Sequence, residues 1–340
     1  MTSRSRKKSQ PQSLPYRSLA SYLREIFGTP VRKVPVDPGF GCPNRDGTLG
    51  KTGCSFCVPD SFVPSHAREG GTPMDQIRRA EKLYSRAPFI VYLQAGSGTY
   101  APIHVFRKMV DELCGLPGMV GLFVGTRPDC VDEEVLDVLA PWEGRKLLWL
   151  ELGLQSSSDR TLTRIGRGHG VEAFVAARGL ARDRDIPVCA HVILGLPGEE
   201  KEDMMATAAF LAKNDVEGVK LHHLQIIRGA GMEDEYMRGE IATLDFSEYP
   251  AIVADFLENI PPWTVVHRLL ADAPEDMLIA PRWPEKIEVV QAIRKEMLAR
   301  QSFQGRSWKG LPTNRQEIAA ADSNPLNPIA GRIVRTLSPG

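Results

Sequence analysis

The sequence predicts an α/β fold built on a parallel sheet, and two patterns in the middle of the chain carry that prediction. Short runs rich in β-branched and aromatic residues alternate with helix-length segments, and this strand–helix unit repeats six times. Several of the runs are apolar throughout, as expected for parallel strands covered on both faces. An open doubly wound sheet and a curved partial barrel both satisfy this alternation.

The expected strands cover residues 32–36, 89–94, 120–125, 147–153, 187–195 and 218–224. The helices between them are expected at residues 74–87, 102–113, 132–140, 157–164 with 171–184, and 199–214; Pro102 and Asp132 suit helix starts. After residue 224 the pattern loosens. Residues 246–259 and 284–299 are expected to be helical, residues 264–269 are a further strand candidate, and a short helix is expected at 315–320.

Composition divides the 340 residues into four segments. Residues 1–20 carry five basic and no acidic side chains, which is typical of a disordered arm. Residues 21–240 form the α/β core, and residues 241–302 form an extension expected to pack on it. Residues 303–340, rich in Gly, Pro, Asn and Ser, read as a loosely ordered tail.

Charge and hydropathy limit the classes of function. Lys plus Arg and Asp plus Glu both number 42, so the formal net charge is zero, which argues against a globally basic nucleic-acid binder but allows a local basic patch. No run of 18 apolar residues occurs, so no membrane span is expected. No apolar signal-peptide core follows the basic start, so we expect the six cysteines in a reducing, cytoplasmic compartment.

Three of the cysteines lie on one Gly-rich loop after the first expected strand. Cys42, Cys54 and Cys57 have the spacing C-x11-C-x2-C. Three thiolates on such a loop suit a soft metal centre. An iron–sulfur cluster with three protein ligands leaves one iron open for chemistry, whereas structural zinc takes four ligands, for which His66 is the local candidate. The spacing alone leaves both centres open.

Polar or Gly-rich sequence follows every one of the six expected strands, and these strand ends meet at one edge of a parallel sheet. Cys130, just beyond the third strand, is a candidate hydrogen-atom donor or second nucleophile; its alternative is a small buried side chain. His222 and His223 alternate faces, so one points into the sheet's interior and is a candidate for substrate or cofactor contact. The alternative for the inner one is a satisfied core histidine.

Seven stretches between about residues 31 and 300 form a distinctive set: DPGFGCPNRDGTLGKTGCSFC, YLQAGSGTYAP, GTRPDCVDEEVLDVLA, LWLELGLQSSSDRTLTRIGRGH, VCAHVILGLPGE, GVKLHHLQIIRG and HRLLADAPEDMLIAPRW. Together they resemble the radical S-adenosylmethionine (SAM) superfamily. More narrowly, they resemble the YhcC/YtqA family, whose members are related to the radical SAM domain of the elongator catalytic subunit.

The resemblance implies a (β/α)6 partial barrel of the TIM type, carrying the C-terminal extension of helices and strand. It implies a [4Fe-4S] cluster on Cys42, Cys54 and Cys57, whose open iron chelates SAM. One electron from a ferredoxin- or flavodoxin-type donor then cleaves SAM to methionine and a 5′-deoxyadenosyl radical, which abstracts hydrogen from a substrate.

Further roles follow from the resemblance position by position. It implies that Glu151 and Gln155 bind the SAM ribose and that Arg167 pairs with the methionyl carboxylate, for which an arginine fork is well suited. Ile193 and Gly195 would back the adenine. Gly96 and Thr99 would accept the methionyl amino group, although this chain has Gln-Ala-Gly-Ser-Gly-Thr where the superfamily often has Gly-Gly-Glu.

Because relatives in this family are linked to maturation of wobble-uridine side chains, the resemblance implies a tRNA substrate. A radical SAM enzyme acting on a small molecule or a protein is the alternative within the same chemistry. The alternative of another class is a zinc-bound scaffold without catalysis, which predicts colourless protein and no SAM cleavage. The sequence does not specify the oligomeric state.

Overall fold

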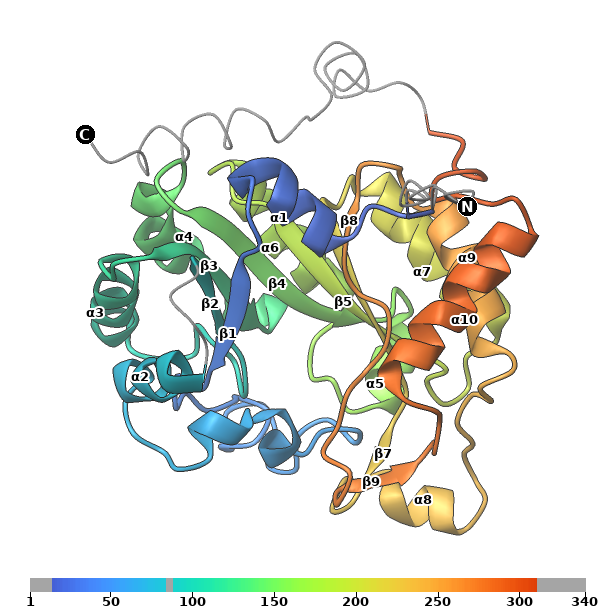
Figure 1. Ribbon diagram of the computed structural model, residues 1–340. Helices are drawn as coiled ribbons and strands as arrows, with labels where there is room; N and C mark the ends of the chain where they lie inside the picture. Colours follow the sequence, from blue (N-terminus) through green and yellow to red (C-terminus); the bar gives the residue numbers. More distant parts are fainter. Residues whose placement is uncertain (1–13, 84–87, 311–340) are drawn as a thin grey trace, which may run out of the picture.

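The computed structural model describes residues 14–83 and 88–310. Its centre is a seven-stranded sheet that curls into a half-barrel (Figure 1), with strands in the order β1-β2-β3-β4-β5-β6-β8, every neighbouring pair parallel. The strands are β1 (Arg32–Val36), β2 (Phe89–Leu93), β3 (Met119–Thr126), β4 (Leu147–Gln155), β5 (Val188–Leu194), β6 (Gly218–His223) and β8 (Val265–Arg268). The partial barrel is therefore confirmed, and the open doubly wound sheet is excluded.

Helices cover the convex face of the sheet and bury the larger hydrophobic core against it. They are α2 (Pro73–Leu83), α3 (Ile103–Cys114), α4 (Glu133–Leu139), α6 (Val171–Arg182), α7 (Lys201–Lys213), α9 (Tyr249–Asn259) and α10 (Lys286–Ala299). Strands β2, β3 and β4 are buried along their whole length, which explains why their sequences are almost entirely apolar. No helix among the described residues is both long and apolar enough to cross a bilayer.

The expected elements are confirmed with shifts of a few residues at their ends; residues 84–87 of the helix expected at 74–87 lie outside the described residues. The strand candidate at 264–269 becomes β8, which pairs with β6, so chain beyond residue 240 completes the sheet. A small antiparallel pair, β7 (Ile226–Ile227) and β9 (Leu278–Ala280), lies with α8 (Glu233–Met237) and α5 (Asp159–Arg164) near the carboxyl ends of the strands. This pair was not predicted, because its strands are too short to show an alternating pattern.

Helix α1 (Leu19–Phe27) fills the amino end of the barrel and was also not predicted. Ser18 caps it by accepting a hydrogen bond from the Ser21 amide at 3.1 Å, and Gly28 ends it in the left-handed conformation. Its buried face packs against inward side chains of the strands, including Trp149 and Cys189. The Tyr22 ring meets Trp149 edge-on at 6.0 Å. This helix therefore seals the amino end of the barrel.

Two expectations are corrected by what the structure shows near the two ends of the described chain. The disordered arm expected for residues 1–20 does not extend over its last residues, since Tyr16 and Leu19 are buried. The loose tail expected from residue 303 begins with an anchored residue: Gln304 is 4% exposed and its side-chain amide donates to the carbonyls of Pro261 and Thr264 at 2.7 and 2.8 Å. The short helix expected at 315–320 lies outside the described residues.

Candidate active site

The apolar cluster that α1 forms with the inward side chains of the strands is the floor of the barrel. A layer of buried charged side chains lies on this floor, toward the carboxyl ends of the strands. At its centre Glu151 of β4 is fully buried and contacts four basic or imidazole groups. The partners are Lys220 Nζ at 2.9 Å, His191 Nε2 at 2.8 Å, His267 Nδ1 at 3.1 Å and Lys33 Nζ at 3.4 Å. Burial alone would raise the pKa of Glu151, but the two lysines and the two histidine hydrogen bonds hold it well below its usual value.

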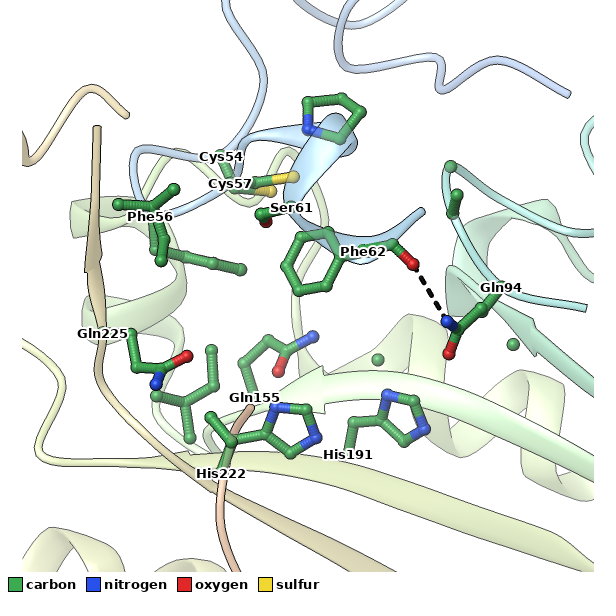
Figure 2. Close-up of a pocket in the computed structure, with 18 of the residues that line it drawn as sticks. Cys54, Phe56, Cys57, Ser61, Phe62, Gln94, Gln155, His191, His222 and Gln225 are labelled. Carbon is green, nitrogen blue, oxygen red and sulfur yellow. Dashed lines mark hydrogen bonds between the residues drawn. The ribbon is translucent and has the colours of Figure 1, made fainter. Parts of the chain in front are cut away.

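Above this layer, a cavity of about 210 Å³ lies between the cysteine loop and the carboxyl ends of the strands. Figure 2 shows Cys54, Cys57 and Phe62 on the loop side, facing Gln155, His191 and His222 on the strand side. The Gln94 side chain donates to the Phe62 carbonyl at 2.9 Å and so joins the two sides. This is the edge of the sheet at which the strand ends predict a ligand site.

Cys42, Cys54 and Cys57 all line this cavity. Burial would raise the pKa of the Cys54 thiol, but the charge and hydrogen bond of Arg167 (Nη1 to Sγ, 3.4 Å), with Arg127 and Asn44, lower it below its usual value. Burial raises the pKa of Cys57 to about 11. In the described part of the chain, no three His, Cys, Asp or Glu side chains converge as ligands of a single metal ion. His66, the zinc-ligand candidate, instead bonds the Pro35 carbonyl through Nε2 at 2.7 Å.

Arg167 lies between the cysteine loop and β4. Its Nη2 donates to the Gly153 carbonyl at 2.7 Å while Nη1 reaches Cys54. A Cβ on Gly153 would come within 2.6 Å of the guanidinium, so only glycine lets Arg167 approach the strand this closely. Arg127 supports this arrangement because its Nη2 donates to the Arg167 carbonyl at 2.9 Å while Asp129 holds it through two hydrogen bonds.

Gln155 and Ile193 also line the cavity, on β4 and β5. Gln155 has a φ of 73°, an uncommon backbone conformation for a residue other than glycine. Backbone strain of this kind persists where the surrounding structure enforces it, often at functional sites. Gly96 lines the same cavity, and its missing side chain matters because a Cβ would lie 2.4 Å from the Phe40 carbonyl oxygen.

Three expected SAM contacts lie elsewhere. Glu151 does not line the cavity, since both its oxygens are engaged in the layer beneath it. Thr99 is buried and its hydroxyl joins Thr126 Oγ1 at 2.7 Å and the Cys130 carbonyl at 2.6 Å, which ties the loop after β2 to the loop after β3. Gly195 lines a neighbouring groove beside Leu244.

Both histidines of β6 are among the residues that line the cavity, but their rings contact different neighbours, as the alternation predicts. His222 lines the cavity, with its ring stacked on His191 at 5.8 Å. His223 stacks on Trp283 at 4.0 Å, within the helices outside the sheet. Burial and the charges of Arg268 and Lys220 lower the pKa of His222 well below its usual value, so its imidazole is neutral.

Cys130 ends a short 3-10 helix, Pro128–Cys130, and is not among the residues that line the cavity. Burial and the adjacent Asp129 carboxylate raise the pKa of its thiol to about 12. The thiol therefore stays protonated, which suits a hydrogen-atom donor better than a nucleophile.

Several cavity residues were missed by sequence reasoning, among them Tyr92, His191, Lys220 and Arg268. Tyr92 and His191 are the polar residues of otherwise apolar strands, and Lys220 follows an apolar residue in β6; these interruptions were the available signal. Arg268 had no such signal. A register shift between Val219 and Lys220 sets two residues of β8, His267 and Arg268, against one step of β6, and a shift of this kind follows from the folded pairing alone.

Comparison with known proteins agrees with this geometry. Residues 36–211 match the sequence family described as the Radical SAM superfamily, and residues 216–299 match the Radical_SAM C-terminal domain. The protein YtqA of Bacillus subtilis is 39% identical over 301 residues, covering 87% of this chain and 94% of its own. Protein YhcC of Escherichia coli is 38% identical, covering 77% and 85%. Human Elongator complex protein 3 is 32% identical over 55% of this chain but only 34% of its own length.

Solved structures support the same fold. The archaeal Elp3 of Methanocaldococcus infernus superposes with a TM-score of 0.61 at 19% identity, covering 81% of this chain and 64% of that one. Methylornithine synthase (PylB) gives a TM-score of 0.50 at 15% identity, covering 84% and 86%. The curled sheet, the cysteine loop at its mouth and these matches together show that the chain is an enzyme of the radical SAM superfamily, in the group that includes YtqA and YhcC.

Proposed function

We propose that Cys42, Cys54 and Cys57 hold a [4Fe-4S] cluster at which SAM is reductively cleaved. The observation that carries this proposal is that all three thiols line one cavity together with Arg167, from the loop after α5, and with Gln155 and Ile193 of two neighbouring strands. A scaffold that only bound zinc would have no need for these side chains opposite the cysteines.

The surroundings of the thiols suit an anionic cluster. Arg167 and Arg127 act on Cys54, and Arg45 donates to the Cys57 carbonyl. Among the described residues, Arg127 Nη1 and Arg167 Nε are buried donors without a hydrogen-bond partner. Buried donors are normally satisfied, so a negatively charged group beside them accounts for both.

When bound, a cluster of this kind would supply the one-electron reduction that cleaves SAM to methionine and a 5′-deoxyadenosyl radical, which would abstract hydrogen from the substrate. The chain's own part is binding, orientation and exclusion of water. Arg167 offers a fork for the methionyl carboxylate, Gln155 offers an amide to the ribose, and Ile193 offers an apolar surface for the adenine.

The test uses anaerobically purified protein reconstituted with iron and sulfide. We expect about four irons per chain and a brown colour, with 5′-deoxyadenosine formed on addition of dithionite and SAM. Replacing Cys42, Cys54 and Cys57 together with alanine should remove the iron, whereas the matched variant Cys130→Ala should keep it. Colourless protein with one zinc and no deoxyadenosine would overturn the proposal.

We further propose that the hydrogen is taken from a wobble-uridine side chain of tRNA, with a ferredoxin or flavodoxin as electron donor. The support is the resemblance to Elongator complex protein 3 and the basic residues at the start of the chain. Addition of tRNA lacking the modification should raise deoxyadenosine formation above the level without substrate. Equal rates with modified, unmodified and no tRNA would favour the alternative, a small-molecule or protein substrate.

A further inference from the structure

The cavity carries more positive than negative side chains, and most of the positive ones are accounted for. It is lined by Arg45, Arg127, Arg167, Lys220 and Arg268, with Asp272 as the acidic residue. The first three lie beside the thiols of Cys54 and Cys57, and Arg127 is also paired with Asp129. Lys220 is paired with Glu151, and Asp272 with Lys286 at 3.0 Å. Arg268 is the remaining basic residue of the cavity, to which none of these partners is assigned.

Arg268 lies on the strand side of the cavity, at the end of β8. Its charge acts on Tyr92, Lys220 and His222, which places its guanidinium among these side chains. Across residues 14–83 and 88–310, no carboxylate pairs with it and no hydrogen bond to it is found. A half-buried guanidinium without a partner loses part of its hydration, and no hydrogen bond or ion pair compensates for that loss.

His222 beside it has a second unsatisfied group. Its Nε2 is buried without a hydrogen-bond partner among the described residues. His191, stacked on His222, is held by Glu151 through Nε2, so its orientation is fixed from the layer below. The register shift that turns Arg268 inward is the kind of irregularity that re-aims side chains at barrel rims.

We infer that Arg268 and His222 form a subsite for an oxyanion, a carboxylate or a phosphate, carried by the substrate group that enters the barrel. The guanidinium supplies the charge and two parallel donors, which a planar or tetrahedral oxyanion accepts. The imidazole Nε2 supplies a further donor. This inference rests on the proposed function for the site's chemistry, but the binding of an anion here does not require the cluster reaction.

The test measures how fast phenylglyoxal, a reagent selective for guanidinium groups, modifies each arginine of the reconstituted enzyme. Rates are read residue by residue by peptide mass spectrometry, at constant ionic strength, with inorganic phosphate, with acetate or with sodium chloride alone. Arg228, exposed on the turn before α8, is the internal control and should react equally in all arms.

We expect phosphate or acetate to slow modification of Arg268 by about tenfold, the factor that one charge-assisted hydrogen-bonded contact contributes. Protection by phosphate alone identifies a phosphate subsite, and protection by acetate alone identifies a carboxylate subsite. Protection should weaken in His222→Gln. Equal rates at Arg268 in all arms, or protection confined to Arg45, Arg127 and Arg167, would overturn the inference.

The outcome is separable from that of the proposed function. Deoxyadenosine formation without protection of Arg268 leaves the proposed function standing and removes the subsite. Protection of Arg268 in an enzyme that makes no deoxyadenosine keeps the subsite and removes the proposed reaction.

Discussion

At the scale of single residues, Glu151 is the carboxylate that holds the buried layer together. Two lysines and two histidines of four other strands converge on it, so both its oxygens are engaged in the layer beneath the cavity. Removing one partner of a buried ion pair leaves charge without compensation, which is far more costly than losing a surface pair.

We therefore expect Glu151→Gln to lower the free energy of unfolding by about 3–5 kcal/mol. Lys33 would lose its counter-ion, and Lys220, whose pKa burial already lowers to about 7 beside Glu151, would be driven to its neutral form. Urea unfolding under anaerobic conditions measures this. Glu25→Gln is the matched control: it breaks an exposed pair with Arg17 and should cost less than about 1 kcal/mol. Equal costs for the two variants would show that the layer is not electrostatically coupled.

Stability should fall as pH falls below about 6.5, the pKa of an unfolded histidine. Burial and Lys220 lower the pKa of His191 to about 3, and burial lowers those of His223 and His267 to about 4. Between these values and 6.5 the unfolded chain binds protons that the folded chain does not. Each such histidine should therefore remove about 1 kcal/mol of stability at pH 5.5.

The measurement is the free energy of unfolding at pH 7.5 and at pH 5.5. His223→Gln should reduce the loss on acidification by one histidine's share, whereas His104→Gln, on the exposed face of α3, should leave it unchanged. A free energy that is the same at both pH values would contradict the assignment of these histidines as neutral.

Arg167→Lys should weaken SAM binding by about tenfold, because lysine keeps the charge but loses the fork that pairs with a carboxylate. Equilibrium dialysis of the reconstituted protein gives the dissociation constant, and iron analysis confirms that the cluster is retained. Arg164→Lys, which alters a surface pair with Glu235, is the control. Unchanged affinity in Arg167→Lys would move the carboxylate contact to another residue.

At the scale of elements, helix α1 fills the amino end of the barrel with apolar side chains. Leu23 is 6% exposed and packs in the apolar floor, whereas Leu298 on α10 is 51% exposed. Leu23→Ala should therefore cost about 2–5 kcal/mol and Leu298→Ala less than about 0.5 kcal/mol, measured by urea unfolding. A similar cost for both would mean that α1 does not seal the barrel.

The strands and most helices of the sheet were predictable because each strand's burial is uniform and strongly reflected in its composition. Helix α1 was not, since its basic and polar neighbours up to Arg17 gave the composition of an arm. For the candidate site, the cysteine loop, Arg167, Gln155 and Ile193 follow from motifs that are local in sequence. The burial of Glu151 and the inward turn of Arg268 depend on cross-strand partners and register, which no local pattern reveals.

At the scale of the whole molecule, the net charge is zero. The basic residues at the start of the chain should therefore matter for the binding of any polyanionic partner. Arg4, Arg6, Lys7 and Lys8 supply four positive charges, so removing residues 1–13 leaves the rest of the chain at −4. We expect this deletion to weaken tRNA binding and to lower the slope of log affinity against log salt by up to about 3.

Filter binding of tRNA at several salt concentrations tests this, with deoxyadenosine formation in the absence of tRNA as the control that should not change. An unchanged salt dependence would show that the basic residues make no contact with RNA phosphates.

The meeting of the two ends of the described chain has a practical consequence. Gln304 donates its amide to the Pro15 carbonyl at 2.9 Å, and Arg17 donates its amide to the Gln304 side chain at 2.9 Å. Both ends thus leave the barrel on the side of α1, opposite the cysteine loop (Figure 1). An affinity handle, fluorophore or solid support joined close to residue 14 or residue 310 is therefore attached on the side of the enzyme opposite the cavity. Molecules tethered in this way should keep the cavity at the carboxyl ends of the strands accessible to a bulky substrate.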